Sequence, residues 1–391
     1  MGAAIAIGAG ATALAIWLVL VFARSGFWLT AERDTNPLPP PPECWPSVCA
    51  IVPARDEAAV IARSVESLLT QDYPGDFRVI LVDDNSSDKT GTLAAQAAQE
   101  AGGAMARRLQ ILSGAPLAAG WTGKLWAVSQ GITAACTSPD HAPPDYLWLT
   151  DADIAHAPDT LRTLVTRAKG EGRVLVSLMA RLRCHSFAER ALVPAFVWFF
   201  QMLYPFASVN GPYGAGAAAG GCMLAERQAL ERAGGIGAVR GALIDDCAFG
   251  ALMKQQGPVW LGLTDRSLSI RRYDDWGSVA AMISRSAYAQ LRYSPALLAG
   301  TLAGLALIYL VPPLLTIAAH GYAQWLGAAA WGLMAIAFQP MVHFYRRSPL
   351  WGLALPGIAL FYAGCTFASA WAHWRGRGGM WKGRAQAAVG K

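Results

Sequence analysis

The distribution of charge along the chain limits what it can fold into. All 26 acidic residues and 24 of the 32 basic residues lie between Thr30 and Arg292. The 29 residues before this block carry only one charge, and the 99 residues after it carry seven, all basic. A helix that spans a bilayer needs about 20 predominantly apolar residues. Both ends of the chain therefore predict membrane helices, and the charged middle predicts a domain in water.

The two apolar ends differ in the number of spans they predict. Residues 1–29 include an uncharged stretch, 1–23, which suffices for one retained transmembrane helix. A cleavable signal peptide is the alternative, but the basic segment that should open one is missing. Residues 293–374 include uncharged stretches for two spans, hinged near Gly321, and for a third over 348–374. Pro312 and Pro313 leave open a re-entrant hairpin in place of one complete span.

Basic residues beside the spans predict the orientation and explain the basic pI of about 9.0. The middle block has two more acidic than basic residues, so the excess positive charge comes from the ends and indicates no nucleic-acid partner. Arg24 and Arg33 follow the first span, which predicts that the middle block faces the cytoplasm. Three complete C-terminal spans would place the basic tail, 375–391, on the other side, and the sequence leaves this conflict open.

The middle block predicts an α/β domain. Residues 30–46 are rich in proline and predict a stiff linker. In residues 47–292, amphipathic helical patterns alternate with short β-branched runs, an order typical of βαβ units and a mainly parallel sheet. The predicted strands are 48–52, 78–82, 146–150, 174–178 and 259–263. Ligands of such sheets bind at the carboxyl ends of the strands.

Acidic residues follow three of these predicted strands. Asp83 and Asp84 end the second, Asp151 and Asp153 follow the third, and Glu57 opens the helix after the first. Turn formation and helix capping are the ordinary explanation for a single such residue. Three acidic strand ends in one sheet instead favour a site for a divalent cation, which prefers carboxylate oxygens.

Six segments occur in the order and spacing typical of one enzyme family: CAIVPARDE, ILVDDNSSDKT, GWTGKLWAVSQG, LWLTDADI, GGCMLAERQALERAGGI and IDDCAFGALMKQQG. The chain resembles the family-2 inverting glycosyltransferases of GT-A fold, with a Rossmann-like domain. With its spans it looks most like the hopene-associated subgroup of bacterial hopanoid pathways. The resemblance implies an enzyme of the bacterial inner (cytoplasmic) membrane that uses Mg²⁺ or Mn²⁺.

The resemblance also implies roles for individual residues. Asp153, with Asp151, would hold the metal ion. The residues that would bind the nucleotide sugar are Pro53, Ala54, Glu57, Asp83, Asp84, Lys124 and Asp151, and Arg285 and Arg292 could hold its pyrophosphate. An equally open alternative for these two arginines is contact with lipid phosphate.

The acid pair Asp245-Asp246 resembles the pair that ends in the family's general base. Inversion needs one carboxylate to take the proton of the acceptor hydroxyl, and the matching residue is Asp246. Helix capping is the alternative for the pair. By the same resemblance, the glycine-rich segment with Gly220 and Gly221 would line the acceptor pocket.

Residues 191–207 form an uncharged, aromatic run that is too short to span comfortably. We expect a helix in the membrane interface whose rings, Phe196, Trp198, Phe199, Phe200 and Phe206, lie at the acyl boundary beside the acceptor pocket. In this arrangement Phe199 and Phe200 would contact the acceptor. A buried core helix is the alternative.

Together these features predict a hexosyl- or hexosaminyltransferase. It would move one sugar from a nucleotide-diphosphate sugar to a hydroxyl of a membrane lipid, a hopanoid or other polyisoprenoid. The alternatives are a polyprenyl-phosphate glycosyltransferase or polysaccharide synthase, a nucleotidyltransferase, and a non-catalytic membrane scaffold. The sequence leaves the sugar, the nucleobase and the oligomeric state open.

Overall fold

The computed structural model describes residues 2–377, 380–381 and 384–385, which fall into two compact units. The helical unit comprises residues 2–31, 184–207 and 273–377. The sheet unit comprises residues 32–183 and 208–272, with the short pair β9 (Met380–Trp381) and β10 (Arg384–Ala385). Each unit thus contains segments from distant parts of the sequence. Most of the predicted basic tail, including Lys382, lies outside the described residues.

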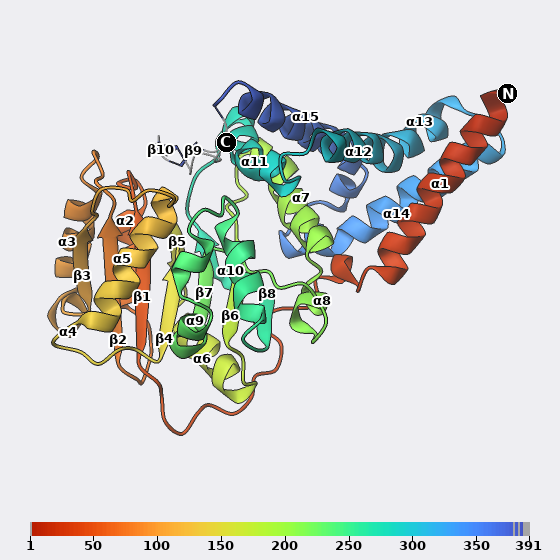
Figure 1. The fold of residues 1–391 in the computed structure, drawn as a ribbon. Coiled ribbons are helices and arrows are strands. Elements are labelled where there is room, and N and C mark those ends of the chain that lie inside the picture. The colour runs from red at the N-terminus through yellow and green to blue at the C-terminus, as the bar shows by residue number, and fades with distance from the viewer. Residues whose placement is uncertain (1, 378–379, 382–383, 386–391) are drawn as a thin grey trace. The chain divides into compact units, whose positions relative to one another are not determined.

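The sheet unit is built on one eight-stranded sheet of order β3-β2-β1-β4-β7-β6-β8-β5 (Figure 1). β1, β2, β3 and β4 are parallel neighbours, as are β6 and β8, whereas β7 runs antiparallel to both β4 and β6. The strands are β1 (Val48–Ala54), β2 (Phe77–Asp83), β3 (Leu109–Ser113), β4 (Tyr146–Thr150), β5 (Ile154–His156), β6 (Leu175–Arg181), β7 (Cys222–Glu226) and β8 (Val259–Ser269).

Helices cover both faces of this sheet because its strands are apolar on both sides. Val48, Ala50 and Val52 of β1 face the core formed with α2 and α3, while Ile51 faces α5, whose Gly131 allows close packing. The helices and helical turns of the unit are α2 (Ile61–Leu69), α3 (Thr90–Ala101), α4 (Gly103–Ala106), α5 (Gly123–Thr137), α6 (Thr160–Gly170), α9 (Arg227–Arg232), η2 (Ile236–Val239) and α10 (Asp245–Lys254). The predicted α/β domain with a mainly parallel sheet is confirmed.

All five predicted strands are present in the eight-stranded sheet, and its other three strands were missed. β3 is only partly buried, β5 has three residues, and β7 is a five-residue strand preceded by glycines, so none has a strong apolar signal. β8 continues six residues past its predicted end, to Ser269. This extension determines which residue stands at the edge of the candidate site.

Part of the predicted linker is docked on the sheet unit. The N–H of Asp34 donates to the carbonyl of Leu263 at 3.0 Å, and the N–H of Leu263 donates to the carbonyl of Glu32 at 2.9 Å. The Asp34 carboxylate is buried, accepts from the Thr264 hydroxyl and lies 3.1 Å from the guanidinium of Arg266. Residues 32–36 therefore belong to the domain.

Four helices of the helical unit are long and apolar enough to cross a membrane: Gly2–Ala23, Pro295–Ala318, Tyr322–Phe344 and Leu355–Trp374. The second consists of α12 (Pro295–Leu305), a π-helical turn η3 (Ala306–Leu310) and α13 (Val311–Ala318). Pro312 and Pro313 do not reverse the chain, because the helix continues from η3 through both prolines into α13. The other elements are α1 (Gly2–Ala23), η1 (Phe27–Leu29), α7 (Phe187–Leu203), α11 (Trp276–Gln290), α14 (Tyr322–Phe344), η4 (Pro349–Gly352) and α15 (Leu355–Trp374), and α8 (Phe206–Asn210) straddles the boundary between the units.

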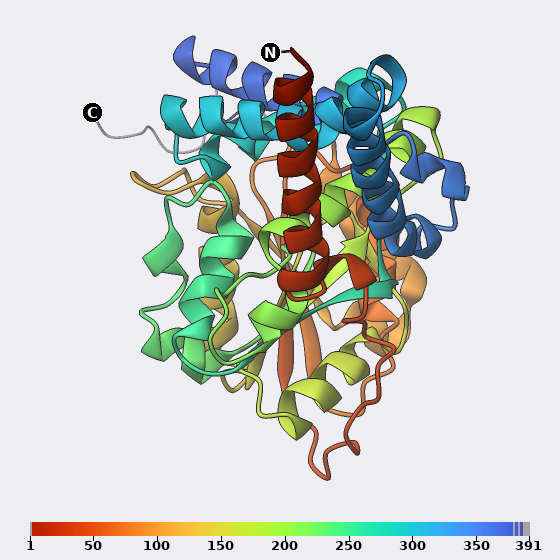
Figure 2. The ribbon, with the colours of Figure 1, turned by 90° about the vertical axis from the view of Figure 1, so that its right-hand side faces the viewer.

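The aromatic run 191–207 lies largely within α7 and packs inside the helical unit. Trp198 is fully buried; its ring is 6.2 Å from that of Trp17 in α1 and 5.6 Å from that of Phe338 in α14, and these two helices run side by side (Figure 2). Phe206 is also buried. The expectation that both rings lie at the acyl boundary is wrong, because both side chains are buried inside the protein. Phe199 is partly buried, 4.9 Å from the ring of Tyr362.

Candidate active site

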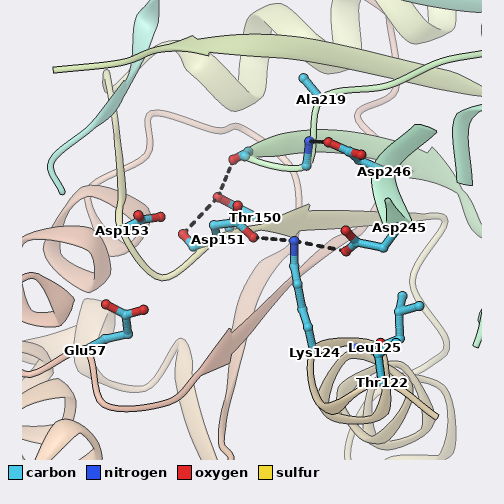
Figure 3. Close-up of polar contacts among 12 residues, drawn as sticks. Glu57, Thr122, Lys124, Leu125, Thr150, Asp151, Asp153, Ala219, Asp245 and Asp246 are labelled. Atoms are coloured by element: carbon cyan, nitrogen blue, oxygen red, sulfur yellow. Dashed lines mark hydrogen bonds and ion pairs between the residues drawn. The ribbon is translucent and has the colours of Figure 1, made fainter. Parts of the chain in front are cut away.

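Lys124 stands at the centre of a cluster of carboxylates at the carboxyl ends of the strands (Figure 3). It lies in the first turn of α5, whose N-cap Thr122 accepts a hydrogen bond from the N–H of Leu125. Its ammonium is 2.9 Å from Oδ1 of Asp151 and 3.0 Å from Oδ2 of Asp245. One lysine thus joins the acid that follows β4 to the acid that opens α10.

The charges in this cluster depend on one another. Burial disfavours the Lys124 ammonium, but Asp151 and Asp245 outweigh burial and raise the pKa of Lys124 above its usual value. Burial also raises the pKa of Asp151, while Lys124 lowers it. Asp245 is not an N-cap, because its carboxylate pairs with Lys124, and the N-cap of α10 is Ile244. The capping alternative therefore does not explain Asp245.

Asp246 is held by the backbone on both carboxylate oxygens. Oδ2 accepts from the N–H of Gly220 at 3.0 Å, and Oδ1 accepts from the N–H of Cys247 at 2.8 Å. A Cβ on Gly220 would lie 3.3 Å from the Lys124 ammonium, so glycine permits this close approach. Burial, and then the neighbouring Asp245 charge, raise the pKa of Asp246 to about 6. A carboxylate with this pKa is ionised at neutral pH yet basic enough to accept a proton.

A second ionic contact lies beside the first and involves a residue that the sequence interpretation missed. The guanidinium of Arg271 is 2.6 Å from Oδ2 of Asp153 and 2.5 Å from Oε1 of Glu57. Burial opposes its charge, but Asp153 and Glu57 together hold the pKa of Arg271 above its usual value. Arg271 was missed because the predicted strand ended at residue 263, whereas β8 continues to Ser269. A correct prediction of this strand end would have pointed to Arg271.

The remaining predicted donor residues lie on the neighbouring strand ends. The N–H of Asp84 donates to the carbonyl of Ala54 at 2.8 Å, and Oδ1 of Asp83 accepts from the N–H of Ser86 at 3.0 Å. The buried carboxylate of Asp84 is 3.7 Å from the guanidinium of Arg55. Pro53 lines a small pocket together with Lys124, Asp151, Asp245 and Gly220. Gly221 packs close to Ala180 and Ile154.

The other predicted site residues belong to the helical unit. Phe199 and Phe200 lie in α7, Arg285 is exposed on α11, and Arg292 is exposed just after it with a left-handed backbone (φ 51°). The cluster described above does not include them. Their contacts with donor or acceptor stay predictions.

The donor set at Asp151 and Asp153 fits a divalent ion that substrate phosphates also coordinate. Within the residues that the structure describes, no group of three His, Cys, Asp or Glu side chains could hold a metal ion unaided. Mg²⁺ is commonly bound by one or two carboxylates together with phosphate oxygens. Two carboxylates at a strand end, each now paired with a basic side chain, match that arrangement.

Comparison with known proteins identifies this part of the chain. Residues 49–234 match the family model described as "Glycosyl transferase family 2", a span that contains Glu57, Lys124 and the Asp-x-Asp of β4. Residues 49–234 thus resemble a family 2 glycosyltransferase domain; this range is just under half of the chain and ends before Asp245, Asp246 and Arg271.

Curated relatives of this glycosyltransferase domain include two cyanobacterial enzymes named beta-monoglucosyldiacylglycerol synthase. The enzyme from Synechocystis sp. is 41% identical over 73 residues, which is 18% of this chain and 14% of the enzyme. The enzyme from Trichormus variabilis is 30% identical over 196 residues, 49% of this chain and 38% of the enzyme. The matches thus span well under half of either relative's length.

A solved structure resembles nearly the whole chain, including the helices outside the glycosyltransferase domain. It is the mannosyltransferase PcManGT from Pyrobaculum calidifontis, in complex with GDP-Man and Mn²⁺. The TM-score is 0.53 at 21% identity, covering 96% of this chain and 98% of that protein. This similarity supports the GT-A fold.

Proposed function

We propose that this protein transfers one hexose from a nucleoside-diphosphate sugar to a hydroxyl of a membrane lipid, with inversion at C1. The observation that carries the proposal is the Lys124 bridge, which brings the Asp-x-Asp strand end and the acid pair of α10 to one place. The first supplies ligands for a metal ion and the second supplies a base. A metal-assisted inverting transfer uses both.

In the proposed reaction, Asp246 accepts the proton of the acceptor hydroxyl. The acceptor oxygen forms a bond to C1 as the bond from C1 to the diphosphate oxygen breaks, and the nucleoside diphosphate leaves. Asp151 and Asp153 would hold Mg²⁺ or Mn²⁺, which neutralises charge on the leaving diphosphate. Lys124, a fixed cation in the same cluster, stabilises the same developing charge.

The long apolar helices support a lipid as the acceptor. Four candidate spans would keep the domain at a bilayer, where lipid hydroxyls are found. The names of the two cyanobacterial relatives make diacylglycerol the first acceptor to test. A hopanoid or other polyisoprenoid alcohol, which the sequence motifs favour, is the second. The basic residues after the first span support a cytoplasmic catalytic domain in a bacterial inner membrane.

The test uses purified full-length protein in nanodiscs, with UDP- and GDP-hexoses and Mn²⁺, and with diacylglycerol or a hopanoid alcohol in the bilayer. We expect release of nucleoside diphosphate and a product one hexose heavier than the lipid. A ladder of longer products would favour a polysaccharide synthase, and pyrophosphate release from sugar phosphate would favour a nucleotidyltransferase. Turnover by Asp246→Asn equal to that of the unmodified protein would refute the mechanism. If the protein neither turned over nor bound nucleotide, the alternative of a non-catalytic membrane scaffold would be favoured.

A further inference from the structure

Arg271 occupies the space between two carboxylates that the proposed function assigns to donor binding. The register of the sheet positions it: Ser269 pairs with Ile154 in the β5–β8 ladder, and the N–H of Ile270 donates to the carbonyl of Asp153 at 2.8 Å. The next residue therefore reaches Asp153 through its side chain. The same guanidinium reaches Glu57, which precedes α2 on another strand end.

These carboxylates are poorly hydrated, so they depend on a nearby positive charge. The Glu57 side chain is 9% exposed and that of Asp153 is 15% exposed. Two such anions close together are stable only with a cation between or beside them. Lys124 forms ion pairs with Asp151 and Asp245, whereas Arg271 forms ion pairs with Asp153 and Glu57. Each carboxylate of the Asp-x-Asp thus has its own basic partner.

A metal ion that binds Asp153 through Oδ2 would compete with Arg271 for this oxygen. Nε of Arg271 is 2.6 Å from Oδ2 of Asp153, a full charge-assisted hydrogen bond. A guanidinium and a divalent cation near one carboxylate also repel each other. The diphosphate of a donor offers the guanidinium a second anionic partner of suitable geometry, because planar guanidinium forks match phosphate as well as carboxylate.

We propose that Arg271 is a positioning residue that competes with the divalent cation for Asp153 and releases it when a nucleoside diphosphate binds. The inference rests on the proposed function for the identity of the diphosphate. It implies that the metal ion binds weakly alone and tightly with nucleotide. By reciprocity, metal and nucleotide raise each other's affinity by the same factor.

The first experiment measures Mn²⁺ binding without nucleotide, from the loss of the free Mn²⁺ electron paramagnetic resonance signal. We expect Arg271→Gln to bind Mn²⁺ about tenfold tighter or more than the unmodified protein, since a charge-assisted contact to Asp153 is lost. Arg271→Lys keeps the positive charge but lacks the planar guanidinium. Its Mn²⁺ affinity should therefore lie between those of the unmodified protein and Arg271→Gln. The matched control is Arg266→Gln: Arg266 lies on β8, five residues before Arg271, and also joins two carboxylates, those of Asp34 and Asp159, away from the cluster.

The second experiment titrates UDP and GDP with and without Mn²⁺ by calorimetry. Metal should raise nucleotide affinity in all proteins, but by a smaller factor in Arg271→Gln than in the unmodified protein and Arg266→Gln. A purely structural role for Arg271 would leave this factor unchanged and lower only the melting temperature. Because Arg271→Lys retains a positive charge, it provides the same test should Arg271→Gln unfold.

The outcomes separate the inference from the proposed function. Equal or weaker Mn²⁺ binding by both Arg271 variants overturns the competition, even if nucleotide and metal still bind together. Tighter Mn²⁺ binding by these variants, with no nucleotide binding to any protein, supports the competition and refutes the proposed function. Tighter Mn²⁺ binding by Arg266→Gln as well would also overturn the assignment, because the effect would then reflect net charge alone.

Discussion

Replacing Asp246 with Asn tests the proposed base directly. The substitution removes the ability to accept a proton while keeping the size of the side chain. Loss of a general base lowers turnover by about 10² to 10⁴. Donor affinity should change little, because the carboxylate of Asp246 bonds to the N–H groups of Gly220 and Cys247 and the Lys124 ion pairs are formed by Asp151 and Asp245.

The raised pKa of Asp246 predicts how strongly the activity should depend on pH. With the pKa of Asp246 near 6, about half of the carboxyl groups are ionised at pH 6 and about a tenth at pH 5. Since only the ionised form acts as a base, kcat/KM for the donor should fall about tenfold from neutral pH to pH 5. This limb belongs to the enzyme before the donor binds. It should disappear in Asp246→Asn.

The assay is steady-state release of nucleoside diphosphate in nanodiscs between pH 4.5 and 8, at saturating acceptor. An asparagine has one acceptor oxygen, so one of two backbone N–H groups loses its partner, at a cost of about 1–3 kcal/mol in stability. A melting curve for each variant separates this loss from chemistry. The control is Asp245→Asn, which should reduce turnover less. If Asp245→Asn were the more damaging change, or if the acid limb survived in Asp246→Asn, the assignment of the base would be refuted.

Three further predictions concern the metal, the acid stability and the helical packing. Asp153→Ala should abolish the Mn²⁺-dependent part of nucleotide binding in calorimetry, and unchanged metal dependence would remove Asp153 from the metal site. Burial lowers the pKa of His156 to about 3, whereas the unfolded chain takes up the proton near 6.5. Stability should therefore fall by about 1.4 kcal/mol per pH unit as the pH drops below 6.5, and denaturant titrations of His156→Gln should lack this slope. Trp198→Ala should lower stability by about 3–5 kcal/mol in detergent melting curves because it leaves a cavity; equal loss in Phe187→Ala, where the ring is 66% exposed, would contradict this.

The parts of the site that could be predicted are those where one local pattern decides the structure. Residues 146–149 are apolar, and Asp151 and Asp153 follow shortly after them, so both the strand and its charged end can be read from neighbouring residues. The same holds for the acid pair that opens α10. The long apolar helices were predictable because bilayer thickness sets a length that a count of uncharged residues can test.

The features that escaped prediction depend on partners distant in sequence. β7 is a strand because it pairs with β4 and β6, not because its five residues favour one. Arg271 becomes a site residue through the register of β8 against β5. In the run 191–207, an aromatic ring suits lipid and protein interior equally well, so hydrophobicity cannot tell which of the two surrounds Trp198.

The contact of α1 with η3 has a consequence for the synthesis of the protein. The indole N–H of Trp17 donates to the carbonyl of Ile308, a partner 291 residues later in the chain. At about 5–20 residues per second, the ribosome needs roughly 15 to 60 seconds to make that partner. During this time the Trp17 indole lacks its hydrogen-bond acceptor, although its ring neighbour Trp198 is made earlier. Assembly of the helical unit is therefore completed late in biogenesis, and truncation before Ile308 would leave the Trp17 indole without its acceptor.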